Sequence, residues 1–242
     1  MILSFFKKGW NKARRLFGQS FEPSSIPLHE RSPDGGMLLV KFVDEDGKFD
    51  YSQYRDVQVA GNKSKLDRVW AMEDNVRAAA ERVRSLVPPP LKFGLCHGTR
   101  RGLEQRWFSE FLGCVVLGTE ISDTAAQFEN TIQWDFHEVK PEWLGAVDFI
   151  YSNSWDHSFD PQRCITGWMS CLRPGGVCVL EHASDHEPVN VRAMDPFKVQ
   201  LAKFVGLLNE WGSGDFRVRE VVPTPVRHSE ADAQHLIVIQ RQ

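Results

Sequence analysis

From residue 91 to residue 242, short apolar runs alternate with longer segments in which apolar residues recur every three or four positions. Short apolar runs predict strands buried on both faces, and the longer period predicts helices that cover them. We therefore expect an α/β fold: a seven-stranded, mostly parallel sheet with helices on both faces. The expected strands are 92–96, 114–120, 131–134, 147–152, 177–181, 216–222 and 235–239, and the expected helices are 99–112, 122–128, 161–172 and 196–211.

Residues 1–90 have a different pattern, which predicts a smaller α+β appendage. The strand-like run 37–43 is followed by a turn, and 48–54 is expected to return as the second strand of a hairpin. The three-to-four rhythm of 66–86 predicts a helix. The intervening segment 58–65 is expected to be a solvated loop, with the alternative that its two lysines hold an anionic or polyhydroxyl group. The predicted division is a helix at 1–20, an α+β extension at 21–90 and the larger domain at 91–242.

The first 20 residues predict a basic amphipathic helix. Such a helix is expected to pack on the rest of the protein or on a partner chain; the alternative is peripheral contact with an anionic membrane. No uncharged apolar run approaches the roughly 18 residues that a membrane span needs. The apolar stripe is Leu3, Phe6, Trp10, Ala13 and Phe17, and the basic residues are Lys7, Lys8, Lys12, Arg14 and Arg15.

Composition and charge argue against a nucleic-acid-binding protein and against a structural zinc site. The chain has 29 Lys and Arg against 32 Asp and Glu, a formal net charge of −3. Residues 1–90 carry a net charge of +3 and residues 91–242 one of −6. No basic stripe interleaved with aromatic residues occurs in 91–242, so nucleic acid is not expected as a partner. The five cysteines form no Cys-x-x-Cys pair. We therefore expect reduced thiols, no structural zinc and a cytoplasmic location.

The residues that follow the first three predicted parallel strands point to a ligand site, because ligands of such sheets bind at the carboxyl ends of the strands. Gly98 lies in a strand-to-helix turn, where the backbone can approach a ligand and a helix N-terminus favours an anion. Glu120 ends the next strand and is placed to accept the hydroxyls of a ribose. Asp135 lies between Trp134 and Phe136, which suits an adenine.

Residues 91–242 resemble the class I S-adenosylmethionine-dependent methyltransferases, which have a Rossmann-like fold. The segment 94–100 is similar to their first glycine motif, Glu120 to their ribose-binding acid and Asp135 to their adenine-contacting acid. Segment 151–155 is similar to the segment of these methyltransferases that faces the methyl group, and the sequence motif at 172–176 is common in the family. The resemblance implies the strand order 3-2-1-4-5-7-6 and S-adenosyl-L-methionine as cofactor. The cofactor-binding residues that it implies are Cys96, His97, Gly98, Thr99, Arg100, Glu104, Glu120, Ile121, Asp135, Phe136, Asn153 and Ser154.

The glycine motif departs from the family pattern at three positions. Gly94 replaces the usual acid, and Cys96 and Arg100 replace two of the three glycines. Arg100 is placed to pair with the methionine carboxylate, and Glu104 to hold the amino group or Arg100. A nicotinamide cofactor is the alternative, but the turn fits a pyrophosphate motif poorly.

Methyl transfer needs a nucleophile held in line with the activated methyl group and, for a hydroxyl acceptor, a base. The loops after the fourth and fifth strands supply the candidates, of which we assign catalysis to His157 and Asp156. Their spacing matches no strong metal motif, and no metal is assigned, although such a mixture of His and carboxylates can hold a divalent cation. The remaining candidates are Glu181, His182, Asp185 and His186.

The chemical class of the methyl acceptor is narrowed by excluding some branches of the resembling family. Segment 152–155 lacks the Asn/Asp-Pro-Pro-Tyr/Phe signature of the family branches that methylate adenine or glutamine nitrogens. O-methylation of a small molecule or a carbohydrate is therefore expected, with a lipid-linked glycan if residues 1–20 bind membranes. A non-catalytic binding module and a protein methyltransferase stay as alternatives.

Overall fold

A computed structural model describes residues 28–188, 192–229 and 233–242. Its main sheet has seven strands in the order β5-β4-β3-β6-β7-β10-β9. The first five of these are parallel, and β10 pairs antiparallel with both β7 and β9. This is the predicted order 3-2-1-4-5-7-6. The strands are β3 Phe93–His97, β4 Val115–Glu120, β5 Thr131–Gln133, β6 Val147–Ser152, β7 Leu172–His182, β9 Phe216–Pro223 and β10 His235–Arg241.

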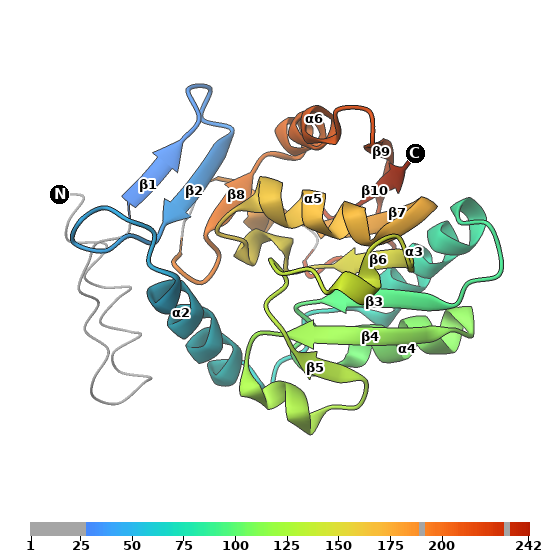
Figure 1. Ribbon diagram of the computed structural model, residues 1–242. Coiled ribbons are helices and arrows are strands. Elements are labelled where there is room, and N and C mark those ends of the chain that lie inside the picture. Colours follow the sequence, from blue (N-terminus) through green and yellow to red (C-terminus); the bar gives the residue numbers. More distant parts are fainter. Residues whose placement is uncertain (1–27, 189–191, 230–232) are drawn as a thin grey trace.

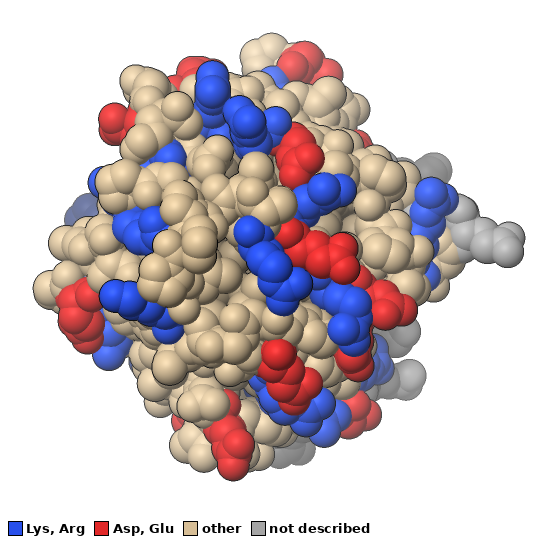
Figure 2. Space-filling model, turned by 90° about the vertical axis from the view of Figure 1, so that its right-hand side faces the viewer, with Lys and Arg blue, Asp and Glu red and all other residues tan. Residues whose placement is uncertain are grey.

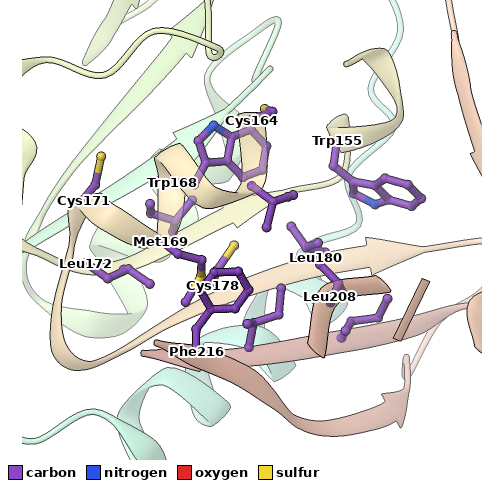
Figure 3. Packing of buried hydrophobic residues seen from close by; sticks show 14 of the residues in the cluster. Trp155, Cys164, Trp168, Met169, Cys171, Leu172, Cys178, Leu180, Leu208 and Phe216 are labelled. Atoms are coloured by element: carbon purple, nitrogen blue, oxygen red, sulfur yellow. The ribbon is translucent and has the colours of Figure 1, made fainter. Parts of the chain in front are cut away.

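Helices cover both faces of this sheet, as expected (Figure 1). On one face α3 (Glu73–Leu86) and α4 (Leu103–Leu112) pack on a core that includes Phe149 and Val179. On the other face α5 (Pro161–Cys171) and α6 (Leu201–Gly212) close a second core. Figure 3 shows this second core from close by, with side chains of α5, α6, β7 and β9 interdigitating. The two cores make the sheet a rigid platform for the loops at its edge.

A smaller sheet, in the order β1-β2-β8, joins two early strands to one that lies far along the chain. It consists of β1 (Leu28–Arg31), β2 (Met37–Lys41) and β8 (Phe197–Val199), all antiparallel. The predicted helix start at 196 is therefore wrong. Phe197 and Val199 are fully buried in the strand that pairs with β2, and the helix begins only at Leu201. Tertiary pairing has overridden the cap signal of Asp195-Pro196.

The predicted second strand of the N-terminal hairpin is also wrong. The helix α2 (Tyr51–Ser64) begins there, because Asp50 accepts a hydrogen bond from the backbone N–H of Gln53 and caps it. The solvated loop expected at 58–65 is wrong for the same reason, since most of it forms the last turns of α2 with Gln58, Gly61 and Asn62 buried. The helices predicted from 66 and from 99 begin later, at Glu73 and Leu103.

The position of α2 matters most for the site. It lies at the edge of the main sheet toward which the arrowheads of β3 and β4 point (Figure 1). The predicted helix at 1–20 lies outside the described residues. Among the described helices, none is long and apolar enough to cross a membrane.

Candidate functional site

The turn after β3 keeps the backbone shape of a glycine motif with a single glycine. Gly98 has φ +76°, and a Cβ there would lie 2.6 Å from the Cβ of Ser154, so only glycine fits. Arg100 also has a positive φ, 43°, at a position where the resembling family has a glycine. The N–H groups of Gly98 and Thr99 both donate to the carbonyl of Thr119, which holds the turn against β4.

Two departures of this motif have a packing explanation. A side chain at Gly94 would meet the ring of Phe149 at 2.2 Å, so the usual acid has no room. Cys96 and His97 are buried, and neither lines a cavity. The His97 ring stacks on Trp168, its Nδ1 lies 2.8 Å from Thr119 Oγ1, and burial lowers its pKa to about 3. The side chains of these two predicted cofactor residues are therefore part of the packed interior.

Glu120 lies at the end of β4, where the sequence predicts it. Its carboxylate is 5% exposed and accepts the backbone N–H of Arg100 at 3.0 Å and of Ser122 at 3.2 Å. Burial raises its pKa, although these two hydrogen bonds act against that shift. The carboxylate thus ties the Gly98 turn to β4 and faces a crevice beside it, together with Ile121.

Asp135 follows β5 and already has protein partners. One oxygen accepts the backbone N–H of His137 at 2.9 Å and lies 2.7 Å from its Nδ1, and the other accepts the hydroxyl of Tyr51 at 2.7 Å. Burial alone would raise the pKa of Asp135, but the hydrogen bonds and charge of His137 outweigh it and leave that pKa lowered. Phe136, next in the chain, is buried against the same crevice.

The cofactor crevice, as we call the space lined by Glu120, Ile121, Asp135 and Phe136, is narrow. Its opposite wall is α2, and its volume is about 50 Å³, well below the roughly 300 Å³ of a typical small ligand site. Asn62 of α2 accepts a hydrogen bond from Thr124 at 2.9 Å and helps hold the helix there. A nucleoside can enter only if α2 moves outward.

The acceptor cavity, which adjoins the crevice at Gly98, Arg100, Ser154 and His157, is larger. Its volume is about 440 Å³. Thr99, Glu104 and Asn153 line it as well, so the predicted cofactor residues Arg100 and Glu104, which were assigned to the methionine, lie there together with two others. Glu104 is buried, which raises its pKa to about 7, and Asn153 Nδ2 donates to it at 3.5 Å.

His157 projects into both spaces from the 3-10 turn Trp155–His157 after β6. Its Nδ1 lies 2.7 Å from the amide oxygen of Gln58. The amide nitrogen of Gln58 donates to the carbonyls of Met194 at 3.1 Å and Ala193 at 3.5 Å, so the oxygen must face the imidazole. Since an amide oxygen only accepts, Nδ1 carries the proton and Nε2 is left for the cavity.

Two carboxylates flank Nε2 of His157: Asp195 at 3.6 Å and Asp156 at 3.9 Å. These three residues have ligand atoms within 4.8 Å of one another and are the described group that could hold a metal ion. Asp156 is already engaged by the buried ammonium of Lys198 at 3.0 Å. Burial alone would raise the pKa of Asp156, but the cationic neighbours outweigh it and lower it. Lys198 repels a second cation at this place.

The candidates after β7 separate into two kinds. Glu181 and His182 are structural: Glu181 accepts the hydroxyl of Tyr151 at 2.6 Å, and His182 Nε2 lies 2.9 Å from the carbonyl of Val199. His186 lines the acceptor cavity, with Nδ1 accepting the N–H of Ala183. Burial lowers its pKa to about 3, so it is neutral. The side chain of Asp185 lies outside the described residues.

Sequence reasoning missed four residues that shape the site. Tyr51 and Gln58 were hidden by the incorrect strand and loop predictions, although Asp50 as N-cap was a signal for a helix. Asp195 was read only as a cap, and Lys198 only as part of a helix. Each of the four contacts a residue far away in the chain, which local patterns do not reveal.

Solved structures with a similar fold include two methyltransferases and a cyclase. A crystal structure of 1,6-didemethyltoxoflavin-N1-methyltransferase from Burkholderia thailandensis, with S-adenosylhomocysteine bound, matches with a TM-score of 0.63 and 15% identity over 90% of this chain and 100% of that one. Geranyl diphosphate C-methyltransferase from Streptomyces coelicolor matches with a TM-score of 0.53 and 13% identity over 68% of this chain and 79% of that one. The cyclase SpnF matches with a TM-score of 0.53 and 13% identity, covering 68% and 80%.

Sequence comparison finds no relative: no family model and no curated protein matches the chain. The fold therefore rests on the strand order, the glycine turn and the structural likeness together. The chain has the Rossmann-like fold of the class I S-adenosylmethionine-dependent methyltransferases.

Proposed function

We propose that this protein is an S-adenosylmethionine-dependent methyltransferase that methylates a hydroxyl oxygen of a small-molecule or carbohydrate acceptor. The observation that carries the proposal is the imidazole of His157, fixed by Gln58 with Nε2 toward a cavity that also contains the Gly98 turn. A base positioned beside a cofactor turn is what hydroxyl methylation requires.

The residues present fit the cofactor. Thr99 Oγ1 is buried in the wall of the acceptor cavity without a hydrogen-bond partner among the described residues, as expected of a group that awaits a ligand. Glu120 would hold the ribose, Asp135 and Phe136 the adenine, and Arg100 and Glu104 the carboxylate and amino group of the methionine. When bound, the cofactor supplies an activated methyl group on a sulfonium. The likeness of the fold to structures that contain S-adenosylhomocysteine supports this assignment.

His157 acts as the general base in the proposed mechanism. Its Nε2 would accept the proton of the acceptor hydroxyl, so that the oxygen could take the methyl group while the carbon–sulfur bond of the sulfonium breaks and leaves a neutral thioether. Asp195 and Asp156, 3.6 and 3.9 Å away, stabilise the imidazolium that forms. Gln58 keeps the ring in the productive tautomer, since its fixed amide oxygen requires a proton on Nδ1. Asp156 therefore acts through His157 and not directly on the acceptor.

The proposed reaction needs no divalent cation. Lys198 already supplies the positive charge that the buried Asp156 requires. Turnover is expected to be the same with and without a chelator, measured as transfer of labelled methyl. A loss of turnover on chelation, restored by added Mg²⁺ or Mn²⁺, would contradict this part of the proposal.

The proposed setting is cytoplasmic, without nucleic acid as a partner. All five cysteines are free, which is typical of a reducing compartment. Figure 2 shows basic and acidic side chains interspersed across one face of the molecule, unlike the continuous basic surface that binds nucleic acid. Peripheral membrane contact through residues 1–20 is the alternative to packing on the protein or on a partner chain. If residues 1–20 bind membranes, their deletion should abolish binding to anionic liposomes.

One observation favours a second candidate, a binding module that does not catalyse. The cofactor crevice is only about 50 Å³, and α2 closes it. The fold also occurs in the cyclase SpnF, so it does not by itself imply methyl transfer.

Incubation with cofactor labelled in its methyl group and fractionated lysate separates the candidates. Label in small molecules or glycans supports the main proposal, and label in protein supports a protein methyltransferase. No label, with thermal stabilisation by the cofactor, supports the binding module. Stabilisation should reach about 2.7 kcal/mol when the cofactor is at 100 times its Kd. The variant His157→Gln, assayed in parallel, should bind cofactor but transfer no label above background.

A further inference from the structure

Positively charged side chains gather in the wall of the acceptor cavity. Five Lys and Arg residues line it, and none forms an ion pair with a described carboxylate. Among the described residues, the guanidinium groups of Arg100 and Arg101 donate to backbone carbonyls, those of Arg68 and Asp67. The five are Lys65, Arg68, Arg100, Arg101 and Arg192.

The acids of the same cavity do not balance these charges. Asp156 is neutralised by Lys198, and Glu104 has a pKa of about 7 because it is buried. Asp195 lies beside His157, 3.6 Å from its Nε2. The cavity is therefore net positive inside a chain whose formal net charge is −3. Such a local reversal of sign concentrates anions at the site.

Lys65 is the most confined of the five. It is half-buried at the C-terminal end of α2 and lines both the cofactor crevice and the acceptor cavity. Its pKa is lowered because the ammonium group is partly buried, and the nearby carboxylates of Asp195 and Asp156, opposed by the charges of Arg100 and Arg192, do not fully offset this burial. A half-buried ammonium group is costly, and an anion bound beside it offsets that cost.

The carboxylate of the cofactor would engage Arg100 and leaves the other four cations for another anion. Three guanidinium groups and an ammonium suit a dianion with three acceptor oxygens better than a single carboxylate. Apolar and ring surface lies next to them: Trp70 and Val69 line the cavity, and the ring of Trp70 lies 4.0 Å from the ring of His228 at a tilt of 38°. Nε2 of His228 is buried without a partner among the described residues. This combination fits an organic phosphate.

We propose that the methyl acceptor carries a phosphate group, bound by Lys65 and Arg192 with Arg68 and Arg101 at the cavity mouth. This inference rests on the proposed function, because it names the substrate class of that same cavity. It also assigns a role to segment 58–65, whose lysines the sequence singled out for an anionic group. The organic part of the acceptor packs on Trp70, which places its hydroxyl on the side of His157.

The test is calorimetric binding of phenyl phosphate to the full chain, with and without saturating S-adenosylhomocysteine. Benzoate and phenyl glucoside serve as the carboxylate and neutral probes. We expect phenyl phosphate to bind more tightly than benzoate in both states and phenyl glucoside to show no binding. The Kd of phenyl phosphate should rise about tenfold in each of the variants Lys65→Met and Arg192→Gln, which is the effect of losing one charge-assisted hydrogen bond.

The matched control is Lys63→Met. Lys63 lies on the same helix two residues before Lys65, but it is exposed, pairs with Asp123 and lines neither space. The Lys63→Met variant should bind phenyl phosphate as tightly as the native chain does. Arg192 is exposed, so Arg192→Gln keeps the test valid if Lys65→Met does not fold.

The outcomes are distinguishable from failure of the proposed function. If S-adenosylhomocysteine binds but phenyl phosphate does not, or benzoate binds more tightly, or the variants bind as well as the native chain, the phosphate inference is overturned. Complete competition between phenyl phosphate and S-adenosylhomocysteine also overturns it, because the cations then serve the cofactor. Phenyl phosphate binding without any S-adenosylhomocysteine binding instead overturns the proposed function and keeps the anion site.

Discussion

The cofactor crevice and the acceptor cavity adjoin each other but are prepared in opposite ways. In the crevice, every polar group that a nucleoside would use already has a protein partner: Glu120 holds two backbone N–H groups, and Asp135 holds Tyr51 and His137. In the cavity, the lining cations have no carboxylate partners within the part of the chain that the structure describes, and the volume is almost nine times larger. Binding in the crevice must exchange existing contacts, whereas binding in the cavity adds new ones.

The helix α2 belongs to both spaces. Tyr51 and Asn62 close the crevice through Asp135 and Thr124, and Gln58 orients His157 at the cavity. An outward movement of α2 that admits a nucleoside would therefore also move the residue that fixes the base. The two spaces are linked mechanically, and the following experiments separate their contributions.

The largest effect is expected at His157. Without the base, kcat should fall by a factor of about 10² to 10⁴ in His157→Gln, while the Kd of S-adenosylhomocysteine changes little. In Gln58→Leu, kcat should fall less than in His157→Gln, and the pH profile of kcat should shift, because the tautomer of His157 is no longer fixed. Initial rates of labelled methyl transfer measure both. Equal rates in native and His157→Gln protein would show that the cavity supplies no base.

A smaller but still large effect is expected at Glu120. Glu120→Ala removes the carboxylate and two charge-assisted hydrogen bonds, so the Kd of S-adenosylhomocysteine should rise about 100-fold. Glu129→Ala, an exposed acid of the neighbouring loop, is the matched control. Calorimetry measures affinity, and thermal unfolding checks that both variants fold. Unchanged affinity in Glu120→Ala would remove the crevice from the cofactor site.

The pH dependence of cofactor affinity should reveal Glu104. Because burial raises its pKa to about 7, it is protonated in the free protein below that pH and becomes a carboxylate above it. Affinity for S-adenosylhomocysteine should therefore rise several-fold between about pH 6 and about pH 8, and the rise should vanish in Glu104→Gln.

The same group has the opposite effect on the stability of the free protein. The folded protein holds a proton on Glu104 that the unfolded chain loses above its ordinary pKa of 4.5. This contribution to stability is therefore present at low pH and is lost as pH rises toward about 7. For the affinity prediction, the contradicting outcome is a rise of affinity with pH that persists in Glu104→Gln, because the rise would then come from another titrating group.

The smallest effect is expected at Tyr51, and it is a gain. Tyr51→Phe removes the hydroxyl that occupies Asp135, so opening of α2 costs one hydrogen bond less. Affinity for S-adenosylhomocysteine should improve about threefold to fivefold, the value of one net hydrogen bond. Ser52→Ala, exposed on the same helix, should bind as the native chain does. A loss of affinity in Tyr51→Phe would mean that Tyr51 contacts the cofactor.

The sequence by itself determined the main sheet and the cofactor end of the site. Strands buried on both faces are continuous apolar runs, and β6 was predicted with its observed bounds, Val147–Ser152. The turn at Gly98 and the acids Glu120 and Asp135 follow from their place at strand ends. These features are local, so a few neighbouring residues are enough to encode them.

The tertiary structure decided what closes and charges the site. Gly61 and Asn62 disfavour a helix locally, and α2 exists because its buried face packs on strand ends far along the chain. Phe197 became a strand residue because β2 offered it hydrogen bonds and burial. The contacts of Gln58 with His157 and of Lys198 with Asp156 join residues 99 and 42 positions apart. Such pairings depend on how the elements pack together, which no local period of hydrophobic and polar residues records.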